Sequence, residues 1–152
     1  MSLFDDIQKK YIEARKKQDK FLTNVLSMLV SDLKYEVINT KKDLTDEDIL
    51  SFIQKTIKQK KEVMQEFISA DRTDLSDKEK AEIEYLSTLL PPALTEKELE
   101  DITVGVIKEL DANSPSDMGK VMKEVMSRVR GRAEGASVKD MVLEKLKIRK
   151  EV

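Results

Sequence analysis

The chain has 152 residues, the length of one domain or of two small subdomains, and a formal net charge of −2. Charged residues make up 38% of the chain, hydrophobic residues 39% and aromatic residues 5%, a composition typical of helical proteins. Because the chain has no cysteine and no histidine, disulfides, thiolate metal sites and the commonest general base in enzymes are excluded.

The first ninety residues contain neither glycine nor proline, so they are expected to form long helices. Apolar residues recur there at helical spacing in four segments. The first helix should end near residue 17, the second should run from 20 to about 38, and the third should span about 46–69. A fourth should end before Pro91-Pro92. Helix starts are predicted by residue pairs that resemble capping boxes: Ser2 with Asp5, Thr45 with Asp48, and Ser76 with Glu79.

The Pro91-Pro92 dipeptide is the predicted boundary between two subdomains, 1–91 and 92–152. Beyond it, Thr95 with Glu98 predicts the start of a fifth helix, and the loop 113–116 leads into a sixth. A tight connection at 131–135 precedes the last helix. No segment shows the alternation of a strand. The sequence therefore predicts an all-α protein, with a four-helix N-terminal bundle and a three-helix C-terminal subdomain.

The sixth predicted helix carries two features that call for an explanation. Met118, Met122 and Met126 recur at every fourth position, a pattern that favours a core stripe over an adaptable binding groove. Gly119 lies in the same helix, where glycine costs about 1 kcal/mol relative to alanine. We expect close packing against another helix to be the reason for this glycine, rather than contact with a ligand.

A basic cluster lies in the last part of the chain, where residues 112–152 carry ten basic and six acidic side chains. The cluster and its neighbouring glycines are Lys120, Lys123, Arg128, Arg130, Gly131, Arg132 and Gly135. Guanidinium groups make planar contacts to phosphate, and glycines let an anion approach the backbone, so these residues are the candidate nucleic-acid-binding site. A structural interpretation stands beside it, in which Gly131 caps a helix and the arginines stabilise its negative end.

A second basic face is formed by Lys58, Lys60, Lys61 and Arg72. Charge runs of this kind are commonly solvated surfaces. Lys60, however, falls at an inward position of the third helix, so it is expected to extend along the core edge or to mark a polar groove. Arg72 and Asp74 are expected to brace the turn between the third and fourth helices.

Three stretches are more distinctive than a generic helix. They are KQKKEVMQEF (58–67) with the loop at 71–75 and EIEYLSTLLPPALTEKEL (82–99), then DMGKVMKEVM (117–126), and then SRVRGRAEGASV (127–138). In this order, and over nearly the whole chain, they resemble the YqeY family. The sequence departs from that family in the second helix, where Ser27 stands in place of a usual Arg. No role of that Arg is transferred.

The resemblance implies two helical subdomains and kinship with the C-terminal region of GatB. GatB is a subunit of the glutamine-dependent amidotransferase that converts misacylated Asp-tRNA or Glu-tRNA, and its related tail helps to hold the tRNA. The family label is a carbon-nitrogen ligase with glutamine as amido-N-donor. This chain is too short for either catalytic part, and it lacks a cysteine or histidine and the Ser-Gly-rich amidase signature.

We therefore expect a tRNA-binding or amidotransferase-associated module with no activity alone and no catalytic residue. The alternative is a protein-binding helical adaptor without catalytic activity. No metal and no cofactor is expected, and the partner is tRNA or another structured RNA, with an amidotransferase or other protein as a further partner. The N-terminus lacks a signal peptide and no run of about eighteen apolar residues occurs, so a cytoplasmic protein without membrane contact is predicted.

Overall fold

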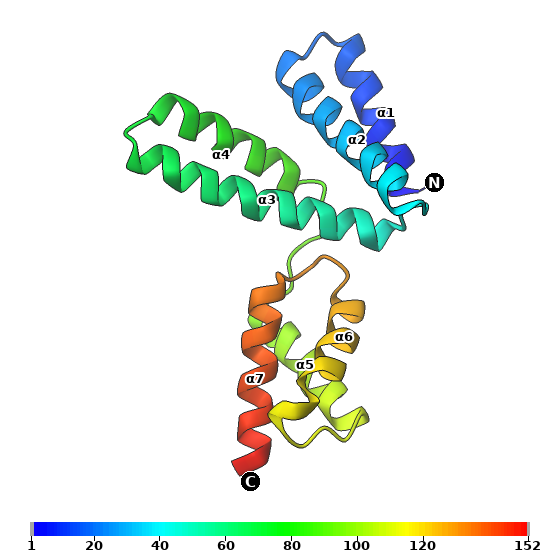
Figure 1. Cartoon of the computed structure of the whole chain (residues 1–152), viewed down its shortest axis with the longest axis vertical. Coiled ribbons are helices and arrows are strands. Elements are labelled where there is room, and N and C mark those ends of the chain that lie inside the picture. The colour runs from blue at the N-terminus through cyan, green and yellow to red at the C-terminus, as the bar shows by residue number, and fades with distance from the viewer. Residues whose placement is uncertain (1, 152) are drawn as a thin grey trace. The chain divides into compact units, whose positions relative to one another are not determined.

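The structure is a computed structural model that describes the backbone of residues 2–151 and the side chains of residues 2–147. The described backbone forms seven α-helices, one short 3-10 helix and no strand (Figure 1), which confirms the all-α class. The α-helices are α1 (Leu3–Lys16), α2 (Lys20–Thr40), α3 (Asp46–Ser69), α4 (Thr73–Ser87), α5 (Glu96–Glu109), α6 (Met118–Val129) and α7 (Gly135–Glu151). The 3-10 helix η1 (Pro115–Asp117) directly precedes α6.

Three of the helices start at the side-chain caps that the sequence predicts. The hydroxyl oxygens of Ser2, Thr45 and Thr95 accept hydrogen bonds from the backbone N–H three residues further on, at 3.2, 3.2 and 3.1 Å. Each cap satisfies one N–H that has no partner inside its helix. Local sequence is therefore sufficient to start α1, α3 and α5.

The predicted cap of the fourth helix is wrong. The helix α4 begins at Thr73, so Ser76 lies inside it, where its buried hydroxyl donates to the Thr73 carbonyl at 3.1 Å. The reason is the short turn after α3, in which Asp71 has a φ of 57°. The N–H of Arg72 also donates to the carbonyl of Phe67 at 2.8 Å, so the chain reverses at once and the next helix starts early.

Five helix ends place a residue other than glycine in the left-handed region of backbone conformation. These residues, which follow α1, α2, α3, α5 and α6, are Gln18, Lys41, Asp71, Asp111 and Arg130. A side chain in this conformation costs about 1–2 kcal/mol relative to the right-handed one. The first four of the turns therefore form without the glycine that usually marks a helix end.

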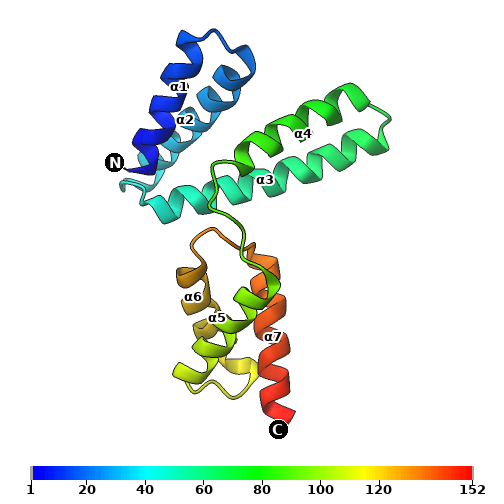
Figure 2. The same cartoon turned by 180° about the vertical axis from the view of Figure 1, so that it is seen from behind.

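The chain divides into two compact units, the first ending at Ser87 and the second beginning at Thr88. In the first unit, α1 packs against α2 and α3 packs against α4, which gives the two helical hairpins of Figure 1 and Figure 2. The helix α1 also contacts α3, and the Leu3 N–H donates to the Asp46 carboxylate at 2.9 Å. The expected four-helix bundle is not confirmed, because the strongest packing lies within each hairpin.

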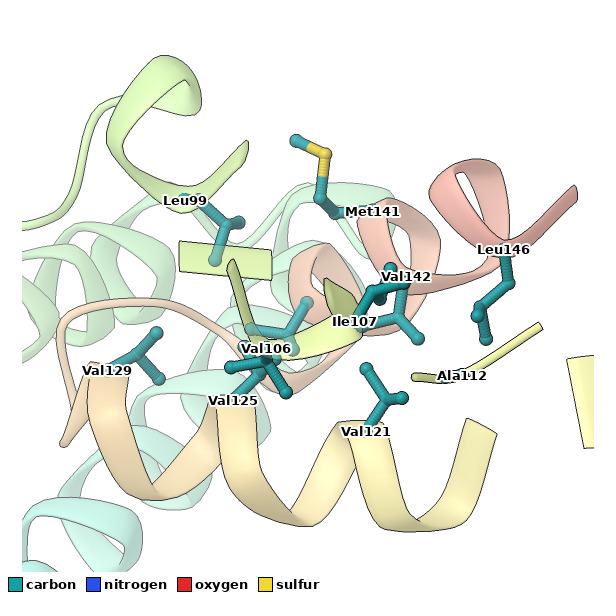
Figure 3. Close-up of a cluster of buried hydrophobic side chains, with 11 residues drawn as sticks. Leu99, Val106, Ile107, Ala112, Val121, Val125, Val129, Met141, Val142 and Leu146 are labelled. Atoms are coloured by element: carbon teal, nitrogen blue, oxygen red, sulfur yellow. The ribbon is translucent and has the colours of Figure 1, made fainter. Parts of the chain in front are cut away.

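The second unit is built around a cluster of apolar side chains from α5, α6 and α7, which Figure 3 shows. Val121, Val125 and Val129 of α6 are each 0% exposed and face this cluster at every fourth position. The prediction of Met118, Met122 and Met126 as the core stripe is correct only in part. They are partly buried and pack against the cluster, whose centre on α6 is formed by the valines.

Gly119 does not mediate helix packing, and that expectation is wrong. The residue is exposed, and a Cβ added to it would meet no atom within 4 Å outside its own helix. It occupies the second position of α6, in the first turn of the helix, on the side away from the core.

Candidate nucleic-acid interface

The predicted basic cluster lies on α6 and on the connection from α6 to α7. Arg130 is the C-cap of α6, with a φ of 43°, and its N–H donates to the Met126 carbonyl at 3.3 Å. Gly131 follows with a φ of 80°, so two successive residues adopt the left-handed conformation. The cap expected at Gly131 is thus one residue earlier, and Gly131 completes the turn that it begins.

Arg128 holds α6 against α5. Its Nε donates to the Glu124 carboxylate at 3.1 Å, and its two terminal nitrogens donate to the two carboxylate oxygens of Glu109, one of them at 3.3 Å. The hydrogen bond from this guanidinium lowers the pKa of the Glu109 carboxyl from its usual value. Two acidic groups therefore compensate the charge of Arg128, which favours the structural interpretation for this residue.

Arg132 holds the segment that precedes α5. Its Nε donates to the Pro92 carbonyl at 2.9 Å, its carbonyl accepts from the Leu94 N–H at 2.8 Å, and its terminal nitrogen lies 3.7 Å from Glu98. These contacts join two parts of the chain that are forty residues apart in sequence. The guanidinium is thus a structural brace, although part of it remains exposed.

The cations that face outward form a second subset. Lys120, Lys123 and Arg130 are all exposed. Lys120 and Lys123 are one turn apart, about 60° around the axis of α6, and Arg130 is the C-cap at the end of that helix. The Lys120 amine pairs with Asp117 at 3.4 Å and is 58% exposed, while the Arg130 Nε donates to the Ser127 carbonyl at 3.3 Å. We call Lys120, Lys123 and Arg130 the α6 stripe.

The two glycines predicted with the basic cluster, Gly131 and Gly135, lie at the two ends of the connection between α6 and α7. Gly135 is the first residue of α7, and the space where its Cβ would lie is open. Gly131 lies between Arg130 and Arg132 in the turn. The structure therefore places both glycines at the connection, beside the end of the α6 stripe.

The second predicted basic face also divides into exposed cations and cations that are paired with carboxylates. Lys58 and Lys61 are exposed on α3, while Arg72 donates to both oxygens of Asp74, at 3.2 and 3.1 Å. Arg72 and Asp74 thus brace the turn, as expected. Lys60 points inward, which confirms its predicted position, so these four residues do not form one continuous cationic surface.

Lys60 lies at a pocket of about 240 Å³ formed by α2, α3 and α4. Its amine is 2.6 Å from the Glu82 carboxylate and 3.3 Å from that of Glu79, one turn earlier on α4. Burial opposes the charge of Lys60, but the hydrogen bonds and attraction from Glu82 and Glu79 outweigh it and raise its pKa. Asp32 of α2 also lines the pocket. The acidic residues were not predicted, because the spacing of Glu79 and Glu82 shows a shared face without showing what that face contacts.

The described residues provide neither a metal-binding cluster nor a membrane-spanning helix. No group of three or more carboxylates lies close enough together there to hold a metal ion. None of the described helices has both the length and the apolar run needed to cross a membrane.

These features define a two-unit helical protein with a cationic stripe on one helix of its second unit and an acidic pocket in its first. The chain belongs to the YqeY family, described as Yqey-like protein, whose model matches residues 4–146. This membership confirms the resemblance that the sequence shows.

Three curated relatives also match. An uncharacterised protein of Schizosaccharomyces pombe is 33% identical over 56% of this chain and 69% of its own length. Altered inheritance of mitochondria protein 41, mitochondrial, is 34% identical in Pyrenophora tritici-repentis and 28% identical in Lachancea thermotolerans. Those two matches cover 66% and 65% of this chain but only 59% and 54% of the relatives. Since both names specify mitochondria, the cytoplasmic location expected for this chain stays a prediction.

Proposed function

We propose that this chain is a tRNA-binding helical module and that the α6 stripe contacts the phosphate backbone. The observation that carries the proposal is the exposure of Lys120, Lys123 and Arg130, which follow one another from the first turn of α6 to its C-cap. Three exposed cations spaced along a helix and its C-cap suit the repeated charge of a nucleic-acid strand. Contacts of this kind fix the position of an RNA without reading its sequence.

The charge of Lys120 is available to a phosphate at little cost. The ion pair of Lys120 with Asp117 is on the surface, and exposed pairs contribute only about 0–1 kcal/mol. A phosphate oxygen can therefore replace the Asp117 carboxylate. Arg128 and Arg132 have a different role in this proposal, since they keep α6 and the connection to α7 in place.

The proposal makes the chain an accessory to an amidotransferase rather than an enzyme alone. The YqeY family membership and the absence of both cysteine and histidine support this role. A carbon-nitrogen ligase that uses glutamine needs an activated nucleophile to release ammonia. In our proposal a partner protein supplies that chemistry and this chain holds the tRNA.

The test is binding of unfractionated tRNA by the full chain across a salt series. The variant removes the stripe by Lys120→Gln, Lys123→Gln and Arg130→Asn, because asparagine tolerates the left-handed conformation at that position. Each phosphate contact contributes roughly 0.7–0.9 to the slope of log affinity against log salt. Three contacts predict that raising salt from about 50 to 200 mM weakens wild-type binding about 20- to 40-fold.

A matched control removes three exposed lysines from α1 instead: Lys9→Gln, Lys10→Gln and Lys16→Gln. Both variants lose the same net charge, so only a local contact surface distinguishes them. We expect the stripe variant to bind more weakly with a flatter salt dependence, and the control to bind as the wild type does. Equal affinities and slopes for the wild type and the stripe variant would refute the proposal.

A further inference from the structure

The pocket beside Lys60 is acidic as well as apolar. Its lining combines Val25, Met28, Leu29, Val63 and Leu86 with the charged residues of three helices. Lys60 is its single cation among three carboxylates, those of Asp32, Glu79 and Glu82. Lys60 is already engaged by Glu82 and Glu79, whereas no hydrogen bond or ion pair from the described residues holds the Asp32 carboxylate. A positive group in an occupant is therefore favoured.

An exposed apolar stripe on α2 includes Met28, which lines this pocket. Phe21, Met28 and Tyr35 are 39%, 62% and 65% exposed, and successive members are seven residues apart. Seven residues are almost two full turns, so the three side chains lie within about 40° of one another on the helix. Single exposed apolar residues are common on protein surfaces, but a stripe at this spacing is typical of a helix that packs against another helix.

The dimensions favour a helix as the occupant. The stripe extends for about 21 Å, which is fourteen residues at 1.5 Å each, or about four helical turns. The pocket at its centre holds about 240 Å³, room for one or two side chains. Small-molecule sites commonly enclose about 300–1,000 Å³. Val63 of α3, which is 36% exposed, also lines the pocket, so exposed apolar side chains from two helices border it and form an apolar groove.

We propose that this groove docks one amphipathic helix of a partner protein, with a lysine or arginine of that helix entering the pocket toward Asp32. The partner's apolar residues, spaced three and four apart, would cover Met28 and Val63, as in other helix-in-groove complexes. Charge complementarity selects this occupant over a second copy of the chain. A symmetric dimer would bring two acidic pockets together, and like charges across an interface are unfavourable.

The probe is a synthetic eighteen-residue peptide that forms an amphipathic helix. Leucines at positions one, four, eight and eleven of its sequence form the apolar face, and one lysine lies at the centre of that face. A matched probe carries glutamate in place of that lysine. We expect the lysine probe to bind the full chain at least tenfold more tightly than the glutamate probe. Equal binding of the two probes, or binding of neither, would overturn the proposal.

Two variants locate the binding site. Met28→Arg places a cation on the exposed stripe and is expected to weaken binding of the lysine probe tenfold or more, while Asp32→Asn weakens it severalfold. Ile12→Arg on α1 is the matched control, since Ile12 is also exposed and does not line the pocket. Equal losses in Met28→Arg and Ile12→Arg would contradict the assigned site. A dimer in sedimentation that Met28→Arg abolishes would show that a second copy is the occupant, which would also refute the proposal.

Discussion

Two glycines of the second unit are expected to respond in opposite ways to the same change. Gly105 lies inside α5, and a Cβ there would meet no atom within 4 Å outside its helix. Alanine is favoured over glycine in a helix interior by about 0.8–1.0 kcal/mol, so Gly105→Ala should be stabilising by about that amount. Gly131 has a φ of 80°, where a Cβ costs about 1–2 kcal/mol, so Gly131→Ala should be destabilising.

The assay is calorimetric melting of the full chain, followed through the transition of the second unit. In a domain of about 60–100 residues, 1 kcal/mol shifts Tm by about 4–8 °C. We therefore expect Tm to rise by about 3–8 °C in Gly105→Ala and to fall by at least about 4 °C in Gly131→Ala. The reasoning is refuted if Gly105→Ala lowers Tm, or if Gly131→Ala leaves it unchanged or raises it.

Three further predictions concern the core, a helix cap and the partly buried ion pair of Lys60 with Glu82. Val125→Ala removes the two γ-methyl groups of a fully buried side chain and should cost about 1.5–3 kcal/mol in urea unfolding, so a cost below about 0.5 kcal/mol would contradict the assigned core. Thr95→Ala removes the cap of α5 and should cost about 0.5–2 kcal/mol, whereas Thr95→Asp, which keeps an acceptor, should lose less than half of that. The pKa of Lys60 is raised in the fold, so its contribution is present at neutral pH and is lost as pH rises above 10.5. Stability should fall less between pH 9 and 11.5 in Lys60→Met than in the wild type, and parallel curves would contradict this role.

Local rules account for the parts of the fold that the sequence predicts. A hydroxyl and the N–H three residues later are neighbours on the chain, so the caps at Ser2, Thr45 and Thr95 follow from sequence. The prediction at Ser76 failed because another local interaction, the turn at Asp71, starts α4 at Thr73, which is three residues before Ser76. Ser76 and Glu79 have the spacing of a capping box, but both lie inside α4, where no helix start is present.

The candidate site was predicted less completely than the helices. The sequence identified the basic residues of α6 as a group, and the structure divides that group by function. Arg128 reaches Glu109 on α5 and Arg132 reaches the Pro92 carbonyl, while Lys120 and Lys123 face outward. Side-chain spacing shows which residues share a face of one helix, but it contains no information on which neighbouring helix supplies a carboxylate.

The sequence by itself determined the all-α class, the number of helices in the described residues and the absence of a cysteine or histidine for catalysis. These properties depend on composition and on interactions within about four residues. Only the tertiary structure decided that Lys60 joins Glu82, twenty-two residues away, and that Asp32 lines the same pocket. The angle and register at which helices pack come from the fit of many side chains at once, so they are decided when the helices meet.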